Sequence, residues 1–357
     1  MLRHSLVSFL LAAGLIPSAQ AQPKITQPTL TLQNSGTTSG LIAVSPVNPQ
    51  VVWACGRNGT FTVTTDGGNT WKAGVVPGAE LLQFRDVEGV SAKVAYLMSI
   101  GVSGAPTDFR IYKTTDGGAT WSLQFVNQLP SAFYDCFAFW TPNRGIAHSD
   151  SVNGVFPDLR ITNGTTWLSI SSNMPPALPG ETSFAASGTC VATQGGQNAW
   201  IATGGTTIAR VLATRDGGDT WNAYDTPLIS SPSAGAFTIA FRNPWNGIVG
   251  GGDLDPSDPN NARTATSSDG GVTWTLTNPP PVTGAIFGLA YAHGVGNGDG
   301  SRTVVVTANA GGAAWTPDEG TTWFSLPGVT GFWSVAFASP KAGWLVGTNG
   351  RILKVSF

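Results

Sequence analysis

Charged residues are scarce in this chain of 357 residues. Asp, Glu, Lys and Arg together make up 11% of it, and the formal net charge is −2. A nearly neutral chain lacks the basic surface that attracts nucleic acid or an anionic membrane, so we expect neither as a partner. Beyond the first residues no apolar run is long enough for a membrane helix, so we expect no membrane insertion.

Cysteine is equally rare, with three residues: Cys55, Cys136 and Cys190. An odd number allows at most one disulfide and leaves one thiol over. All three fall on predicted inner strands, where buried thiols are common. There is no Cys-x-x-Cys pair, no Gly-x-Gly-x-x-Gly between a strand and a helix, and no haem attachment motif. We therefore expect no redox activity and no cofactor.

The chain is instead rich in glycine (46 residues) and tryptophan (13 residues), which is typical of a turn-rich all-β protein. Its first residues have the pattern of a signal peptide, with Arg3, an apolar run over 6–16 and small residues up to Ala21. We predict cleavage near Ala21 and a periplasmic or secreted protein. Residues 22–357 then form a single domain.

One turn motif, Ser/Thr-x-Asp-x-Gly-x-Thr-Trp, occurs five times. Its aspartates are Asp66, Asp116, Asp216, Asp269 and Asp318. A worn copy at 162–167 fills the one gap, with Thr162 in the place of the aspartate. The closing tryptophans follow one another at intervals of 46 to 54 residues, which fits a four-stranded propeller blade.

The residue types of the motif suit a tight hairpin turn. We expect the Asp carboxylate to accept free backbone N–H groups, a Gly to adopt positive φ, and the Trp to begin the next strand and fill the seam between blades. The five aspartates are therefore interpreted as structural and not catalytic.

The repeat also predicts how the ring closes. Residues 343–357 match residues 52–64, so the chain ends after the third strand of a seventh blade, and residues 29–33 would supply the fourth. Closure removes the sheet edges that invite aggregation. We predict a seven-bladed β-propeller; six or eight blades is the alternative, because blades 4 and 6 carry insertions.

Candidate functional residues gather on the face opposite the Asp motifs. The acidic ones, at strand starts and exits, are Asp86, Asp135, Glu181, Asp150 and Asp253. The aromatic ones are Tyr134, Phe237, Phe287 and Trp333. Carboxylates beside aromatic rings suit sugar binding, and two at a suitable separation suit glycoside hydrolysis. The alternative is a polar plug in which these carboxylates pair with Arg85 or water.

Arginine recurs six positions before the Asp of the motif or at the equivalent place in the last blade. The positions are Arg110, Arg210, Arg263 and Arg351, with Arg57 in a nearby turn. They could grip an anionic partner, or each could pair locally as a repeated structural residue. Two loops, 253–258 and 296–300, could bind calcium, but neither has the spacing of a calcium loop, so we expect no metal. His148 could act as a base beside Asp150, although a lone loop histidine usually has no such role.

The turn motif resembles the Asp box, or BNR repeat. With Gly343-Trp344-Leu-Val-Gly347, it makes the chain similar to the photosystem II assembly and stability factor group and to exported bacterial BNR-repeat proteins. That resemblance implies a non-catalytic assembly factor that engages partners through arginines, here Arg57, Arg110, Arg210, Arg263 and Arg351. Sialidases and xyloglucan-cleaving hydrolases also use Asp-box propellers, and Phe109-Arg-Ile-Tyr112 resembles a sialidase motif without its proline.

These observations predict an exported, monomeric, non-catalytic propeller that binds a protein or glycan partner. The alternative is a glycoside hydrolase that uses two of the five candidate acids.

Overall fold

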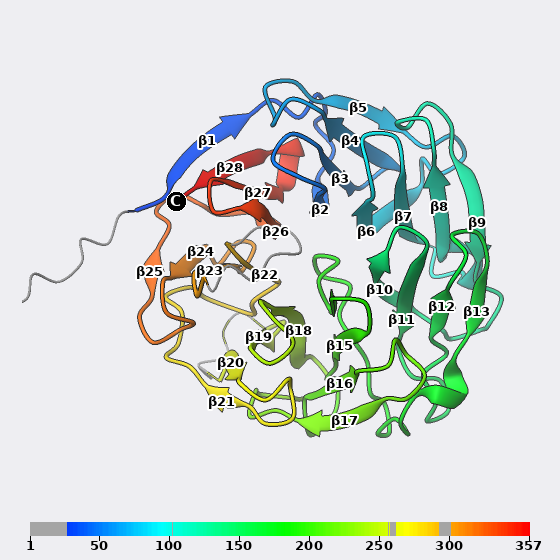
Figure 1. The fold of residues 1–357 in the computed structure, drawn as a ribbon, viewed down its shortest axis with the longest axis vertical. Helices are drawn as coiled ribbons and strands as arrows, with labels where there is room; N and C mark the ends of the chain where they lie inside the picture. The colour runs from blue at the N-terminus through cyan, green and yellow to red at the C-terminus, as the bar shows by residue number, and fades with distance from the viewer. Residues whose placement is uncertain (1–26, 102, 256, 258–261, 293–300) are drawn as a thin grey trace, which may run out of the picture.

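The computed structural model describes residues 27–101, 103–255, 257, 262–292 and 301–357. Seven four-stranded antiparallel sheets stand around a common axis (Figure 1). The predicted seven-bladed propeller is confirmed, and the counts of six and eight are wrong. The predicted signal peptide and its cleavage site near Ala21 lie outside the described residues.

Each blade is named here from its innermost strand, A, to its outermost, D. Blade 1 consists of β2 (Leu41–Pro46), β3 (Val52–Gly56), β4 (Thr60–Thr64) and β5 (Lys72–Val75). Blade 2 consists of β6 (Leu82–Gly89), β7 (Ala95–Gly101), β8 (Arg110–Thr114) and β9 (Ser122–Val126). Blade 3 consists of β10 (Tyr134–Thr141), β11 (Arg144–Ser149), β12 (Leu159–Ile161) and β13 (Trp167–Ser169). Blade 4 consists of β14 (Val191–Gln194), β15 (Asn198–Ala202), β16 (Arg210–Thr214) and β17 (Asn222–Asp225).

The remaining blades follow the same order. Blade 5 consists of β18 (Ala234–Phe241), β19 (Gly247–Asp253), β20 (Thr264–Ser267) and β21 (Thr275–Leu276). Blade 6 consists of β22 (Gly288–Tyr291), β23 (Val304–Thr307), β24 (Ala313–Thr316) and β25 (Phe324–Ser325). Blade 7 consists of β26 (Phe332–Ser339), β27 (Ala342–Gly347), β28 (Ile352–Ser356) and β1 (Thr29–Gln33).

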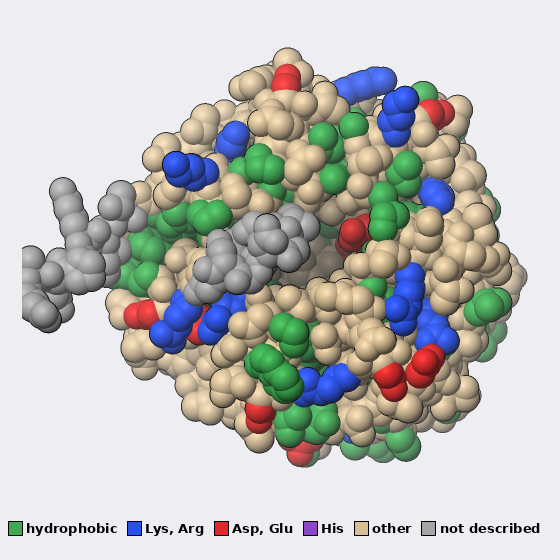
Figure 2. Space-filling model, viewed as in Figure 1, with side chains coloured by type: hydrophobic (Ala, Val, Ile, Leu, Met, Phe, Trp, Pro, Cys, Tyr) green, Lys and Arg blue, Asp and Glu red, His purple; other side chains and the backbone are tan. Residues whose placement is uncertain are grey.

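Helical structure in the described residues is limited to three single turns of 3₁₀ helix. These are η1 (Pro106–Asp108), η2 (Ser171–Asn173) and η3 (Thr348–Gly350). None of the helices in the described part of the chain could cross a membrane. Figure 2 shows one face of the ring, which is hollowed at its centre and has Lys and Arg side chains spread around the rim.

The two ends of the chain close the ring by pairing β1 with β28. The antiparallel register runs from Thr29 opposite Ser356 to Gln33 opposite Ile352, as the sequence predicted. Gln33 then joins blade 7 to blade 1. Its Oε1 accepts hydrogen bonds from Trp344 Nε1 at 3.1 Å and Trp71 Nε1 at 3.2 Å, and its Nε2 donates to Gly67 O.

The Asp motifs form the predicted turns. In the first copy, Asp66 Oδ1 accepts the Thr70 N–H at 2.9 Å and Oδ2 accepts the Thr70 hydroxyl, while Thr64 Oγ1 accepts the Gly68 N–H. Gly67 and Gly68 both have positive φ. The Thr70 hydrogen bonds, first that of its hydroxyl, hold the pKa of Asp66 at about 2.

In the incomplete copy of the motif at 162–167, the residue in the place of the aspartate is not the one that the sequence predicted. Its turn between Ile161 and Trp167 is one residue shorter than the turn between Thr64 and Trp71, so the aspartate's place falls on Asn163 and not on Thr162. Asn163 Oδ1 accepts the backbone N–H groups of Thr165 and Thr166, both at 2.9 Å. Because an amide oxygen accepts as a carboxylate oxygen does, the turn survives without the charge.

Apolar side chains fill the seams between blades. Trp71 of blade 1 packs in one cluster with Trp344 of blade 7, and Trp167 of blade 3 packs with Ile111 of blade 2. The sequence predicted at most one disulfide and one remaining thiol. The structure has one disulfide, between Cys136 and Cys190, and Cys55 is a buried free thiol. The disulfide ties the innermost strand of blade 3 to the segment that enters blade 4.

Replacement of Gln33 by Ala should destabilise the ring at its closure. Two indole N–H groups lose their acceptor, and a buried unsatisfied donor costs about 1 to 3 kcal/mol. We expect the free energy of unfolding in urea to fall by about 2 kcal/mol. Leu32→Ala is the control, because its side chain is exposed on the same strand. Equal stability of the two variants would contradict the role of Gln33.

Candidate functional site

A β-bulge near the start of strand A interrupts the alternation of side chains in five blades. The bulges lie between Leu41 and Ala43, Phe84 and Asp86, Tyr134 and Cys136, Ala236 and Thr238, and Phe332 and Ser334. The residues within them are Ile42, Arg85, Asp135, Phe237 and Trp333. A bulge re-aims a side chain in this way at many functional sites. All of these residues except Ile42 line one cavity.

The cavity has a volume of about 380 Å³ and lies on the face where A strands begin and B strands end. This is the face opposite the Asp-motif turns, as predicted. Blades 2 to 4 give it a polar wall of Arg85, Asp135, Asp150 and Ser183. Blades 4 to 7 give it an aromatic wall. That wall consists of Phe184, Phe237, Phe287 and Trp333.

The aromatic wall is a continuous arc of rings. Phe184 and Phe237 are stacked with ring centroids 3.9 Å apart, Phe237 and Phe287 are 5.9 Å apart, and Phe287 and Trp333 are 5.3 Å apart. Leu254 adds an exposed apolar side chain after β19. The arc can therefore contact one apolar group from several sides.

The carboxyl groups of Asp135 and Asp150 line the same polar wall, close enough for each to shift the pKa of the other. Asp135 is 1% exposed, and its pKa is raised well above the usual range by burial and by the charge of Asp150. Burial also raises the pKa of Asp150 to about 6, while the Ser183 N–H donates to its Oδ1 at 2.7 Å. Two carboxyl groups in contact hold a proton between them.

Arg85 lies beside this pair but is bound to its own neighbours. It donates from Nη1 to Ala185 O at 3.0 Å and from Nη2 to Gln83 Oε1 at 3.2 Å. Burial, and then the charge of Arg57, lower its pKa. Arg57 itself is exposed in the turn between β3 and β4.

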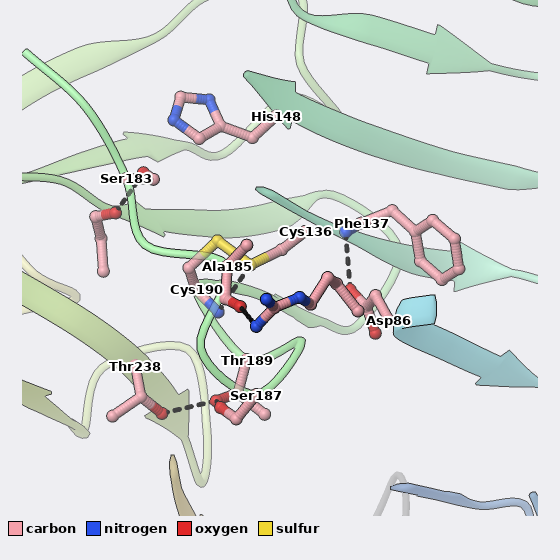
Figure 3. Close-up of a disulfide and its surroundings, with 12 residues drawn as sticks. Asp86, Cys136, Phe137, His148, Ser183, Ala185, Ser187, Thr189, Cys190 and Thr238 are labelled. Atoms are coloured by element: carbon pink, nitrogen blue, oxygen red, sulfur yellow. Dashed lines mark hydrogen bonds between the residues drawn. A yellow bond between two sulfur atoms is a disulfide. The ribbon is translucent and has the colours of Figure 1, made fainter. Parts of the chain in front are cut away.

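The wall segment 183–190 is fixed at several points (Figure 3). Its end is held by the Cys136–Cys190 disulfide. Ser187 Oγ donates to Phe287 O at 2.6 Å, and the hydroxyls of Thr189 and Thr238 are 2.7 Å apart. The cavity wall is therefore preorganised by contacts to blades 3, 5 and 6.

Three other predicted acids do not line the cavity. Asp86 is buried and accepts the N–H groups of Val87 and Phe137, both at 2.7 Å, which links blade 2 to blade 3 (Figure 3). Glu181 is fully buried and makes a bidentate ion pair with Arg210. Asp253 accepts the Ser233 hydroxyl and the Asp255 N–H, both at 2.9 Å. Only Asp135 and Asp150 of the five are brought together.

The recurring arginines are bound locally and do not form one patch. Arg263 donates to the carbonyls of Val282 and Gly284, both at 2.8 Å. Arg351 donates to Thr330 O at 2.7 Å and lies over the Phe332 ring. The other two arginines also bind groups near them. Arg110 donates to Thr107 O, and Arg210 donates to Glu181.

Tyr134 and His148 also lie elsewhere than the sequence suggested. Tyr134 is buried, and its hydroxyl donates to Pro157 O at 2.9 Å. His148 is not on a surface loop: it is fully buried on β11, and its Nδ1 is 2.9 Å from an oxygen of Asp158. The sequence analysis missed Asp158, because nothing in the spacing pairs two residues ten apart.

The calcium loops contain no recognisable site in the part of the chain that is described. No three His, Cys, Asp or Glu side chains converge there as metal ligands would. Asp258 and residues 296–300 lie outside the described residues.

Solved structures with the same fold support the description of the ring. The chain is similar to "YCF48 bound to D1 peptide" (17% identity, TM-score 0.63, covering 94% of this chain and 96% of that one). It is similar to YCF48 from Cyanidioschyzon merolae (20% identity, TM-score 0.61, 92% and 98%) and to the WD40 propeller domain of Doa1 (11%, 0.56, 92% and 97%). No family model and no curated protein matches the chain. At these identities the likeness establishes the propeller fold.

Replacement of Glu181 by Gln should destabilise the protein, because it leaves Arg210 buried without its counter-charge. Breaking a buried pair in this way costs about 3 kcal/mol or more. Asp219→Asn is the matched control: the Asp219 side chain is 66% exposed, so its ion pair with Arg160 contributes under about 1 kcal/mol. Urea unfolding of both variants measures the difference. A Glu181→Gln protein as stable as the control would refute the structural role.

The Asp135–Asp150 pair should make stability fall as pH rises. An unfolded Asp loses its proton near pH 4. Folded Asp150 holds its proton to about pH 6. Between these values the folded state binds more protons, so the free energy of unfolding decreases, on the order of 2 kcal/mol in total. Asp150→Asn should flatten this part of the profile and raise stability at pH 7.

Thermal or urea unfolding between pH 4 and pH 8 checks this expectation. Asp253→Asn, outside the cavity, is the control and should keep the wild-type slope. An Asp150→Asn profile parallel to the wild type would show that the pair does not share a proton.

Proposed function

We propose that this chain is an exported, non-catalytic propeller that binds a protein partner across the face where its cavity opens. The observation that carries the proposal is the preorganised cavity itself, with an aromatic arc from four blades beside a small polar wall. Apolar pockets with few fixed polar groups are typical binding sites. The exposed Leu254 would extend the contact area onto the rim.

The solved neighbours are consistent with a protein partner. One of them is a structure of YCF48 bound to a D1 peptide. A propeller of this shape thus accommodates a peptide in at least one case. Fold alone is a weak warrant for function, so the proposal depends on the cavity of this chain.

Glycoside hydrolysis is less well supported by the same geometry. It needs two carboxyl groups at least about 5 Å apart on either side of the sugar bond. Asp135 and Asp150 instead lie in direct electrostatic contact on one wall of the cavity, and Glu181 is neutralised by Arg210. A hydrolase would therefore need a rearrangement of the cavity wall that its disulfide and hydroxyl contacts oppose.

Capture experiments with purified residues 22–357 test the proposal. We expect Leu254→Glu to reduce retention of a partner from an envelope extract of the source cells at least tenfold, because it places a charge on the apolar rim. Leu123→Glu is the matched control, since both leucines are 51% exposed and Leu123 lies on the outer strand β9.

Retention is measured by quantitative mass spectrometry against the wild type. If Leu254→Glu and Leu123→Glu retain the same proteins to the same extent, binding does not use this face.

A further inference from the structure

We propose that the cavity receives the side chain of a lysine from the protein partner, with its ammonium group on the Asp135–Asp150 pair and its methylene stem along the aromatic arc. This deepens the proposed function, on which it rests, by naming the chemistry of the group that is bound.

The polar wall has two donor side chains, Arg85 and Ser183, but neither donates a hydrogen bond to Asp135: the Ser183 hydroxyl donates to Ala202 O, and Arg85 Nε has no partner among the described residues. Asp135 Oδ2 is buried, and no donor among the described residues reaches it. After burial, the charge of Asp150 has the largest effect on Asp135, and the carboxyl group of Asp150 is also an acceptor. Two acceptors in contact need either a trapped proton or a donor brought by a ligand. An ammonium group supplies three donors and a positive charge.

The aromatic wall favours the same ligand. The faces of Phe and Trp rings attract cations within about 6 Å, and they also cover an apolar stem. Phe184, Phe237, Phe287 and Trp333 form such a surface in the same cavity as the acid pair. A lysine side chain combines both properties in one group, with four methylenes before its ammonium.

The charges around the pair decide how binding depends on pH. Asp135 faces Asp150, Asp158 and Arg85, and Asp150 faces His148 as well. Arg85 opposes a cation, but its Nη1 and Nη2 are engaged by Ala185 and Gln83. When the ammonium group binds, the proton shared by the pair leaves to solvent, and the carboxylate left behind accepts an N–H from the ammonium. Affinity should therefore rise with pH until the pair has lost that proton.

Three probes of one shape test the charge preference. n-Pentylamine, 1-pentanol and pentanoate are unbranched five-carbon molecules with a cationic, a neutral and an anionic end group, and ligand-observed NMR at pH 8 ranks their dissociation constants. We expect the amine to bind at least tenfold more tightly than the alcohol, and pentanoate to bind least. A tenfold loss of amine affinity between pH 8 and pH 6 is expected as well. Pentanoate binding as tightly as the amine would overturn the proposal.

Variants link the preference to the cavity. Asp135→Asn keeps the shape and removes the charge, so the amine should lose its advantage over the alcohol. Asp253→Asn is the matched control and should leave it intact. Trp333→Leu, which removes part of the aromatic wall, should weaken amine and alcohol alike. If Asp135→Asn fails to fold, Asp150→Asn and Trp333→Leu still decide the question, because unchanged amine binding in both would refute the site.

Capped pentapeptides test whether the site binds a lysine within a protein chain or only a free small amine. A peptide with one central lysine should bind, while its norleucine and acetyl-lysine counterparts should not. If pentylamine binds and the lysine peptide does not, the bound ammonium group does not come from a lysine of a protein. The probes need no partner, so failure of amine binding with intact capture of a partner would refute this inference alone and leave the proposed function standing.

Discussion

The fold depends on the pairing of the two ends of the chain. Without β1, blade 7 would have three strands, and β28 would present an open edge at the seam with blade 1. Gln33 adds a polar link there, because its amide binds two indoles and a glycine carbonyl of the neighbouring turn. The ring holds its innermost strands at fixed distances from the axis only while it is closed. The cavity at the centre is thus a consequence of a contact on the outer rim.

The site arises from an irregularity that the closed ring supports. In blades 2 and 5 the bulged residue of strand A leaves the alternation of the strand and lines the cavity, while the next residue binds the neighbouring blade. Asp86 Oδ2 accepts the Phe137 N–H of blade 3, and Thr238 Oγ1 accepts the Leu289 N–H of blade 6. The bulge therefore separates two tasks. One residue forms the cavity, and its successor stabilises the inner ring.

The sequence sufficed for the fold because its signals are local and repeated. The blade count, the role of residues 29–33 and the Asp turns all follow from the period. The site was only half predictable. Asp135, Asp150 and Trp333 were correctly assigned to the cavity face, but Tyr134 was taken for a cavity residue where its neighbour Phe133 is one. A bulge shifts the alternation by one residue, and no composition rule locates that shift. Pairing between residues far apart in the sequence, as in Glu181 with Arg210, leaves no local signal either.

Comparison of equivalent positions in the blades distinguishes structural residues from candidate functional residues in this chain. Arginine occupies one equivalent position in four blades, and each of these arginines is bound locally to carbonyls or to a carboxylate. The position that these four blades share therefore serves local structure. The bulge position behaves in the opposite way: it holds Ile42, Arg85, Asp135, Phe237 and Trp333. Because a common backbone position carries five different side chains, the asymmetry of the cavity comes from these residues. Recognition by this propeller should therefore be sought where its blades differ.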